Sequence, residues 1–175
     1  MEQRLILMRH ATADSDDGRD HARKLTEGGI DEAHRVGRWL ASKGRVPDRI
    51  LSSSAFRCRE TCQALLAGLG HEIKIEVDFD DRLYNAPAEV LLDTLTGLAE
   101  MAGADSPDGE TVLLLAHNPG ISHLAFELAD TASDTTILRS GFSPAAIACF
   151  ETDSSWSMLS RGASRLVCFR LASEF

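Results

Sequence analysis

Four residues of this sequence have side chains that together could bind and transfer a phosphoryl group. Arg9 and His10 directly follow one short apolar run, and His117 follows another. Arg57 falls in the first turn of a helix that the pattern predicts from about residue 56 to residue 66. Guanidiniums offer fork-shaped donors to phosphoryl oxygens, and a helix N-terminus adds backbone N–H groups. The set therefore indicates a binding site for a phosphoryl group.

Two imidazoles in one such site would have different roles. A neutral ring nitrogen is a nucleophile near neutral pH without an added base, and neighbouring cations disfavour its protonation. We expect the second imidazole to stay protonated against the phosphate dianion. Taken singly, each residue has a simpler explanation, such as a structural histidine or a solvated arginine with an intrahelical partner. Their shared position at predicted strand ends and a helix start favours one site and a two-step reaction through a phosphohistidine.

Predicted strands and helices alternate along the chain around these side chains. Short apolar runs predict buried strands, and apolar positions three and four residues apart predict helices. Strands are expected near residues 5–8, 47–52, 73–77, 111–116, 145–150, 156–159 and 165–171, and helices after Thr26, from about Phe56, from Pro87 and after Asn118, with Thr26 and Asn118 as N-caps. This order predicts an α/β fold, a three-layer sandwich whose mostly parallel central sheet has helices on both faces and an antiparallel strand late in the chain. In such sheets, sites form at the carboxyl ends of the strands.

The composition narrows the class of protein. The length of 175 residues fits one domain, which we expect to span residues 1–175. Eighteen Lys and Arg against 27 Asp and Glu give a net charge of −9, which disfavours nucleic acid and anionic membranes as partners. No run approaches the roughly 20 apolar residues of a membrane-spanning helix, and the N-terminus lacks a signal-peptide pattern, so we expect a cytoplasmic protein. The four cysteines show no Cys-x-x-Cys spacing, so we expect no metal.

Three segments resemble the motifs of the histidine phosphatase superfamily, the group that contains the cofactor-dependent phosphoglycerate mutases and many acid phosphatases. Residues 7–11, Leu-Met-Arg-His-Ala, resemble its Arg-His-Gly signature, residues 52–61 its second segment, and residues 115–118, Leu-Ala-His-Asn, its third. The matches follow in order along roughly the whole chain. The resemblance implies a phosphoglycerate mutase-like fold and no cofactor. It also implies His10 as nucleophile and a phosphate pocket completed by the side chains of Arg9, Arg57, His117 and Asn118.

One departure from the family pattern concerns the general acid. Members that cleave phosphate esters usually carry Glu or Asp in a segment like Leu-x-Glu after the third strand, whereas this chain has Asn85 at that place. The short length, the Leu-Tyr-Asn-Ala segment and the His-Asn-Pro segment instead resemble the small phosphohistidine phosphatase branch, the SixA type. A phosphoramidate suits a site without a strong acid, because a ring nitrogen protonated from solvent leaves more readily than an alkoxide. The resemblance therefore implies hydrolysis of phosphohistidine on a protein.

Two alternatives stay open. Asp81 could act as the acid of a phosphatase for small phosphate esters, or the arginine pocket could dock phosphorylated partners without hydrolysis. Arg23, near the predicted entrance, is a candidate contact to a phosphohistidine-bearing protein or a small phosphorylated molecule. The sequence names neither the physiological substrate nor the oligomeric state.

Overall fold

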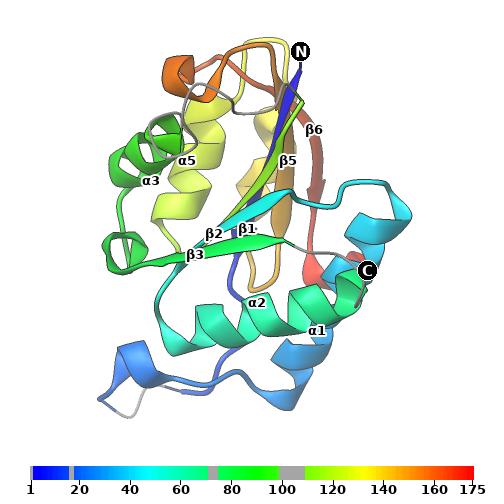
Figure 1. Cartoon of the computed structure of the whole chain (residues 1–175), viewed down its shortest axis with the longest axis vertical. Helices are drawn as coiled ribbons and strands as arrows, with labels where there is room; N and C mark the ends of the chain where they lie inside the picture. Colours follow the sequence, from blue (N-terminus) through cyan, green and yellow to red (C-terminus); the bar gives the residue numbers. More distant parts are fainter. Residues whose placement is uncertain (1, 16–17, 71–74, 99–108) are drawn as a thin grey trace.

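A computed structural model describes residues 2–15, 18–70, 75–98 and 109–175. In this part of the chain, six strands form one sheet in the order β3-β2-β4-β1-β5-β6 (Figure 1). The strands are β1 (Gln3–Arg9), β2 (Arg49–Ser53), β3 (Glu76–Asp80), β4 (Thr111–Ala116), β5 (Ile147–Thr152) and β6 (Arg165–Arg170). The first four strands pair in parallel, whereas β5 is antiparallel to both β1 and β6. The mostly parallel sheet with a late antiparallel strand is thus confirmed.

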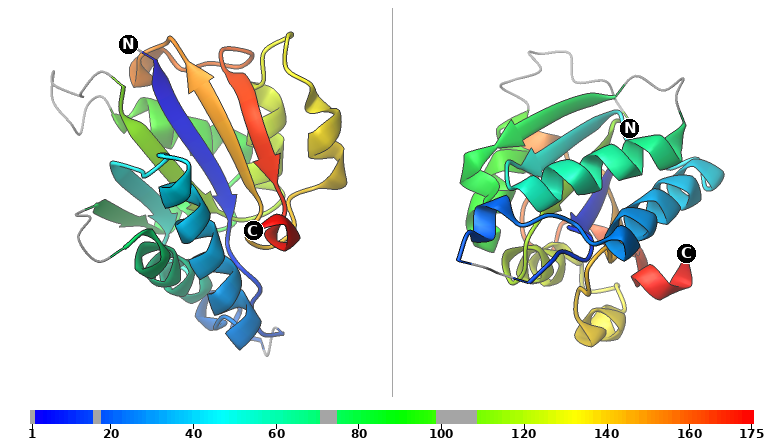
Figure 2. Two further views of the ribbon diagram at one scale, coloured as in Figure 1. Left: turned by 90° about the vertical axis from the view of Figure 1, so that its right-hand side faces the viewer. Right: turned by 90° about the horizontal axis from the view of Figure 1, so that it is seen from below.

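Helices cover both faces of the sheet and complete the predicted three layers (Figure 2). They are α1 (Glu27–Ser42), α2 (Phe56–Leu69), α3 (Ala88–Thr96) and α5 (Gly120–Leu128). One hydrophobic core joins the sheet to α1 and α2, and a second core on the opposite face joins it to α3 and α5. Within the described ranges, no helix is long and apolar enough to cross a lipid bilayer.

The first strand shows why the sheet carries helices on both sides. Leu5 and Leu7 belong to the core under α3 and α5, whereas Ile6 and Met8 belong to the core under α1 and α2. Successive side chains of a strand point to opposite faces, so a strand that is apolar at every position must be covered on both. All four side chains are buried, and each such burial contributes roughly 1.5–3 kcal/mol. The strand that carries Arg9 at its end is therefore firmly anchored.

Helices α1 and α2 pack closely because glycines lie at their contact. A Cβ atom on Gly37 would lie 2.2 Å from the carbonyl oxygen of Leu65, and one on Gly68 would lie 2.1 Å from the carbonyl oxygen of His34. Any larger residue at these two positions would push the helices apart. Because Arg57 lies in the first turn of α2, this contact also helps to position its guanidinium.

The helix starts agree with the sequence in three cases and differ in one, and α2 begins at Phe56 as predicted. The Thr26 hydroxyl accepts a hydrogen bond from the N–H of Gly29 at 2.9 Å, so Thr26 is the N-cap of α1 as predicted. Helix α3 begins directly after Pro87, also as predicted. Helix α5 begins at Gly120 without a side-chain cap, so the prediction that Asn118 caps it is wrong. The amide of Asn118 instead bonds a loop carbonyl near the site described below.

Two predicted strands need correction or qualification. Residues 156–159 do not form a strand, because Trp156–Met158 is a short 3-10 helix. Trp156 is fully buried, and its indole N–H donates to Glu110 Oε2 at 2.8 Å, so the apolar residues there fill the core rather than extend the sheet. The strand predicted near residues 73–77 corresponds to β3, which begins at Glu76, while residues 73 and 74 lie outside the described residues.

The register of the parallel strands brings distant residues to one edge of the sheet. Arg9 is the partner of Ala116, so the next residues, His10 and His117, follow adjacent strand ends. Strand β2 lies on the other side of β4 and leads into α2, which carries Arg57 in its first turn. The carboxyl ends of three neighbouring strands thus deliver the candidate side chains to the same place.

Candidate active site

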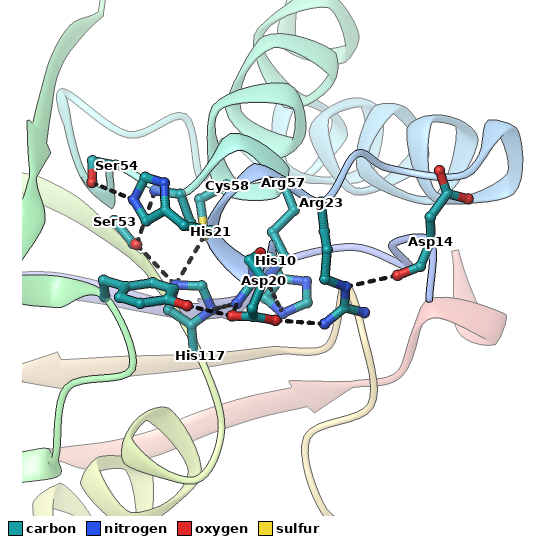
Figure 3. A network of polar contacts seen from close by, with 12 residues as sticks. His10, Asp14, Asp20, His21, Arg23, Ser53, Ser54, Arg57, Cys58 and His117 are labelled. Carbon is teal, nitrogen blue, oxygen red and sulfur yellow. Dashed lines mark hydrogen bonds and ion pairs between the residues drawn. The ribbon is translucent and has the colours of Figure 1, made fainter. Parts of the chain in front are cut away.

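His10, Arg57 and His117 meet at this edge (Figure 3), and the charge of Arg9 acts on His10. We call these four side chains the floor of the pocket. The ring centroids of His10 and His117 are 5.2 Å apart. The guanidinium of Arg57 contacts both rings, since its Nε is 3.2 Å from His10 Nε2 and its Nη2 is 3.1 Å from His117 Nδ1. The structure therefore brings together two imidazoles and a guanidinium that are far apart in the sequence.

The hydrogen bonds of His10 place the proton on one ring nitrogen and leave the other as an acceptor that faces Arg57. Nδ1 is 2.8 Å from the carbonyl oxygen of Ala11, which can only accept, so Nδ1 carries the proton. Nε2 faces the N–H of Arg57, which can only donate, so Nε2 is unprotonated. Burial, together with the charges of Arg57 and Arg9, lowers the pKa of His10 to about 4. Near pH 7 the ring is therefore neutral, with a nucleophilic Nε2.

His117 is held neutral as well. Its Nδ1 accepts a hydrogen bond from Arg57, and its Nε2 donates to Ser53 Oγ at 2.8 Å. Burial and the charge of Arg57 lower the pKa of His117 to about 3, although the carboxylate of Asp20 acts in the opposite direction. His117 is therefore neutral in this structure, and its protonation against a phosphate dianion stays a prediction.

Arg9 is tied to the loop that precedes β5. Its Nη1 donates to the carbonyl oxygen of Phe142 at 2.7 Å, while its buried Nε has no partner among the residues described. The side-chain amide of Asn118 donates to the same carbonyl at 2.9 Å. Asn118 thus lies beside Arg9 at the margin of the floor, and Arg9 keeps donor capacity for a ligand.

Thr61 connects α2 to the segment that follows β1. Its hydroxyl donates to the carbonyl oxygen of Arg57 at 2.7 Å and accepts from the backbone N–H of Ala11 at 3.1 Å. Ala11 in turn accepts the hydrogen bond of His10 Nδ1. Thr61 thereby helps to fix the distance between the imidazole and the guanidinium. Thr61 lies one turn after Arg57, at the end of the matched segment 52–61, but no role was predicted for it.

Three further side chains close over the floor, and we call them the roof: Asp20, Arg23 and Tyr84. Asp20 and Arg23 come from the segment between β1 and α1, and Tyr84 comes from the segment between β3 and α3. The Asp20 carboxylate accepts hydrogen bonds from Arg57 Nη2 at 3.1 Å, from Arg23 Nη1 at 3.0 Å and from the Tyr84 hydroxyl. The backbone carbonyl of Asp20 also accepts from Arg57 Nη1 at 2.6 Å. A carboxylate of the chain itself therefore sits on the cationic pocket.

The contacts of Asp20 fix its protonation state. The hydrogen bond from Tyr84, and then the contacts with Arg23 and Arg57, hold the pKa of Asp20 well below its usual range. The same hydrogen bond raises the pKa of the Tyr84 phenol. Near neutral pH, Asp20 is therefore ionised and Tyr84 is protonated. No role was predicted for either residue, since Asp20 lies in a polar run without a pattern and Tyr84 was noted only as part of the Leu-Tyr-Asn-Ala segment.

The remaining candidates lie at different places. Arg23 belongs to the roof, and its Nε also donates to the carbonyl oxygen of Asp14 at 2.7 Å. Asn85, at the position where the family pattern suggests an acid, is exposed and has a positive φ of 51°. Its neighbour Tyr84 reaches the pocket instead. Asp81 is exposed in the short helix before Tyr84, and a role as acid stays a prediction.

The donor set of the pocket suits an anionic ligand. Within the part of the chain that the structure describes, no group of three or more His, Cys, Asp or Glu side chains is placed to hold a metal ion. Guanidiniums around a neutral imidazole favour an electrophile that carries negative charge, as a phosphoryl group does.

Comparison with protein families gives a match that agrees with these residues. A model of the histidine phosphatase superfamily (branch 1) matches residues 5–87, which include Arg9, His10 and Arg57. An uncharacterized chloroplastic protein of Arabidopsis thaliana is 35% identical over 127 residues, covering 69% of this chain and 56% of the relative. The chain therefore spans little more than half the length of that relative.

Two solved structures are similar over nearly their full length. One is a protein of Nakamurella multipartitia, provisionally designated phosphohistidine phosphatase SixA, with 28% identity, a TM-score of 0.78 and coverage of 97% of this chain and 96% of the other. The other, from Agrobacterium tumefaciens with the same provisional designation, has 31% identity, a TM-score of 0.72 and coverage of 96% and 97%. These matches confirm the predicted phosphoglycerate mutase-like fold class.

Proposed function

We propose that this chain, which belongs to the histidine phosphatase superfamily, hydrolyses phosphohistidine on a protein through a covalent phosphohistidine at His10. One observation carries the proposal. The floor presents a neutral, nucleophilic imidazole beside guanidiniums, while the carboxyl group that reaches it, that of Asp20, is held ionised. Such a site can bind and transfer a phosphoryl group but offers, among the described residues in contact with it, no carboxylic acid for a poor leaving group.

The first step transfers the phosphoryl group to the enzyme. The substrate imidazole takes up a proton from solvent at its free ring nitrogen. Nε2 of His10 then attacks phosphorus, the bond between phosphorus and the substrate nitrogen breaks, and the substrate leaves as a neutral imidazole. Arg9 and Arg57 stabilise the charge on the phosphoryl oxygens. The arriving dianion favours a protonated His117, whose Nδ1 can donate to it once Arg57 Nη2 has turned from Nδ1 to the phosphoryl oxygens.

The second step releases inorganic phosphate. A water molecule attacks the phosphorus atom of the phosphohistidine, the bond to Nε2 of His10 breaks, and the water proton passes to solvent. His10 returns to its neutral form with the proton on Nδ1, where the carbonyl of Ala11 holds it. The reaction needs no metal or nucleotide to balance.

The chemistry of the leaving group supports phosphohistidine over phosphate esters. An alkoxide must be protonated as it leaves, whereas a phosphoramidate nitrogen obtains its proton from solvent. Tyr84 cannot readily supply a proton, because its pKa is raised. The provisional SixA designation of the two similar structures supports the same substrate class. We include a phosphohistidine-bearing protein partner and a cytoplasmic location in the proposal.

A comparison of substrates tests the proposal. Turnover is measured on a phosphohistidine-containing peptide, on phosphoserine and on a sugar phosphate, with wild type, His10→Ala and the exposed control His123→Ala. We expect the highest kcat/KM on phosphohistidine, and we expect radioactive phosphate to be trapped on wild type and His123→Ala but not on His10→Ala. Preferred hydrolysis of an ester would shift the assignment to a small-molecule phosphatase. Binding without any turnover would leave a docking module.

A further inference from the structure

Tyr84 reaches the pocket with both its ring and its hydroxyl. The ring lies edge-on to the ring of His117, with centroids 5.5 Å apart, and packs against His21 at 4.8 Å. The guanidinium carbon of Arg57 is 5.8 Å from the ring centroid. These contacts leave the phenol directed at the carboxylate of Asp20, to which it donates. Tyr84 is therefore held in the pocket by the floor as well as by Asp20.

The Asp20 carboxylate marks where a phosphoryl oxygen would bind. Its Oδ2 accepts from Arg57 Nη2, and the same Nη2 is within hydrogen-bond distance of His117 Nδ1 (Figure 3). The neighbouring Nε of Arg57 faces Nε2 of His10, the nitrogen that attacks phosphorus in our proposed reaction. A phosphoryl group attached to that nitrogen competes with Asp20 for the Arg57 donors, because carboxylate and phosphoryl oxygens use the same fork-shaped geometry.

Tyr84 donates to the very oxygen atom of Asp20 that also accepts from Arg57. We propose that Tyr84 is a further phosphoryl-binding residue: its hydroxyl donates to Asp20 in the present structure and to a phosphoryl oxygen once the substrate has displaced that carboxylate. The inference rests on the proposed function, because it assigns a ligand in the same pocket. The phenol suits this role, because a phenol with an ordinary pKa of about 10 is protonated near neutral pH and can donate.

The exchange of partners makes a specific prediction for pairs of variants. In wild type, Tyr84→Phe removes one hydrogen bond from the free protein, where Tyr84 donates to Asp20, and one from the phosphate complex. The two losses therefore largely cancel in the free energy of phosphate binding. With Asp20 replaced by Ala, the competing carboxylate is absent and only the bond to phosphate is lost. A double-mutant cycle therefore separates a phosphate ligand from a residue that merely holds Asp20.

The experiment measures the binding of inorganic phosphate by calorimetry to wild type, Asp20→Ala, Tyr84→Phe and the double variant. We expect Asp20→Ala to bind phosphate about tenfold more tightly, since an internal competitor is removed. We expect Tyr84→Phe to weaken binding about tenfold in the Asp20→Ala background, the usual effect of a hydrogen bond to a charged group, and less than about twofold in wild type. Melting curves check folding, and Asp20→Asn replaces Asp20→Ala if the latter unfolds.

A second readout uses the fact that the chain contains a single tyrosine. Labelling with 3-fluorotyrosine gives one fluorine resonance, which we expect to shift on addition of phosphate to Asp20→Ala. Equal phosphate affinity of Asp20→Ala and the double variant, with no fluorine shift, would overturn the role of Tyr84 while leaving the proposed function intact. Absence of phosphate binding by every variant would overturn both.

Discussion

The floor and the roof of the pocket each contain charged side chains, but the two sets are held in different ways. On the floor, Arg57 and His117 are each only 2% exposed and follow directly from strand ends and a first helical turn. In the roof, the side chains of Asp20 and Arg23 are 31% and 24% exposed, and they come from a connecting segment. Packing and register position the floor, whereas mutual charge attraction positions the roof.

The floor and the roof should therefore differ in how readily their side chains change partners. A floor residue that moved would leave buried donors without acceptors, which costs roughly 1–3 kcal/mol for each group. A roof residue can exchange one hydrogen-bond partner for another at much lower cost, because water reaches it. We therefore expect substitutions in the floor to act mainly on the chemical step and substitutions in the roof to act mainly on the binding of anions.

The largest difference is expected between the two arginines that hold Asp20. Arg57→Ala should lower kcat on the order of 10²–10³, because the guanidinium contacts both imidazoles and stabilises the transferring group. Arg23→Ala should mainly raise KM, by about tenfold. Steady-state kinetics on a phosphohistidine peptide measure both, with Arg59→Ala as the control on the same helix. Equal effects of the two substitutions on kcat would contradict the distinction between floor and roof.

The pH dependence of the free energy of unfolding should report on the two imidazoles of the floor. Folding holds the rings of His10 and His117 neutral, with pKa values of about 4 and about 3 against an ordinary value of 6.5. The unfolded chain therefore binds more protons than the folded chain below pH 6.5, so the free energy of unfolding should fall as the pH drops from about 6.5 toward 4.

Denaturation curves between pH 4 and pH 7 test this dependence, and ring proton resonances report the two titrations directly. His10→Ala should show a shallower decrease in stability than wild type, because one of the depressed pKa values is removed. A midpoint near pH 6.5 for either ring would mean that burial does not control its charge.

Two neighbouring serines offer a matched pair of smaller changes. Ser53 accepts the hydrogen bond from Nε2 of His117 on the floor, whereas the Ser54 hydroxyl contacts His21 next to the roof. Ser53→Ala should lower kcat about tenfold and reduce the melting temperature, because a buried ring N–H loses its acceptor. Ser54→Ala should change kcat by less than about twofold. The reverse order would show that His117 does not depend on this bond.

The smallest effect is expected at Asp81, which is exposed and has no described contact to the floor. Asp81→Asn should change kcat/KM on a phosphohistidine peptide by less than about twofold, since the leaving imidazole draws its proton from solvent. The same variant is assayed on p-nitrophenyl phosphate. A selective loss of ester hydrolysis would identify Asp81 as an acid and favour the small-molecule alternative.

The sequence predicted the floor because regular structure leaves a pattern. The apolar runs before His10 and His117 could only be buried strands, and parallel strands align their carboxyl ends. The same reasoning failed where an apolar run fills the core without pairing, as at Trp156. It also misjudged Asn118, whose amide bonds a loop carbonyl that a local helix-capping rule does not consider.

The roof could not be predicted because no periodicity describes a connecting segment. Asp20 lies in a polar run with other acidic residues, and only the three-dimensional structure distinguishes it from them. Tyr84 was visible beside Asn85, yet the family pattern drew attention to the position of the acid rather than to its neighbour. The burial that keeps His117 neutral in this structure could not be predicted for a related reason, since spacing alone does not show how deeply a side chain is buried.

The hydrogen bond between Arg57 Nη1 and the backbone carbonyl of Asp20 bears on how the Asp20 carboxylate can leave the pocket. That bond does not involve the Asp20 side chain, so it can persist while the carboxylate swings aside about its own χ1. The carboxylate can then leave by breaking its contacts with Arg57, Arg23 and Tyr84 and changing its rotamer, while the backbone carbonyl still holds Arg57. The connecting segment therefore stays attached to the start of α2 when the position of the carboxylate becomes available to an anion.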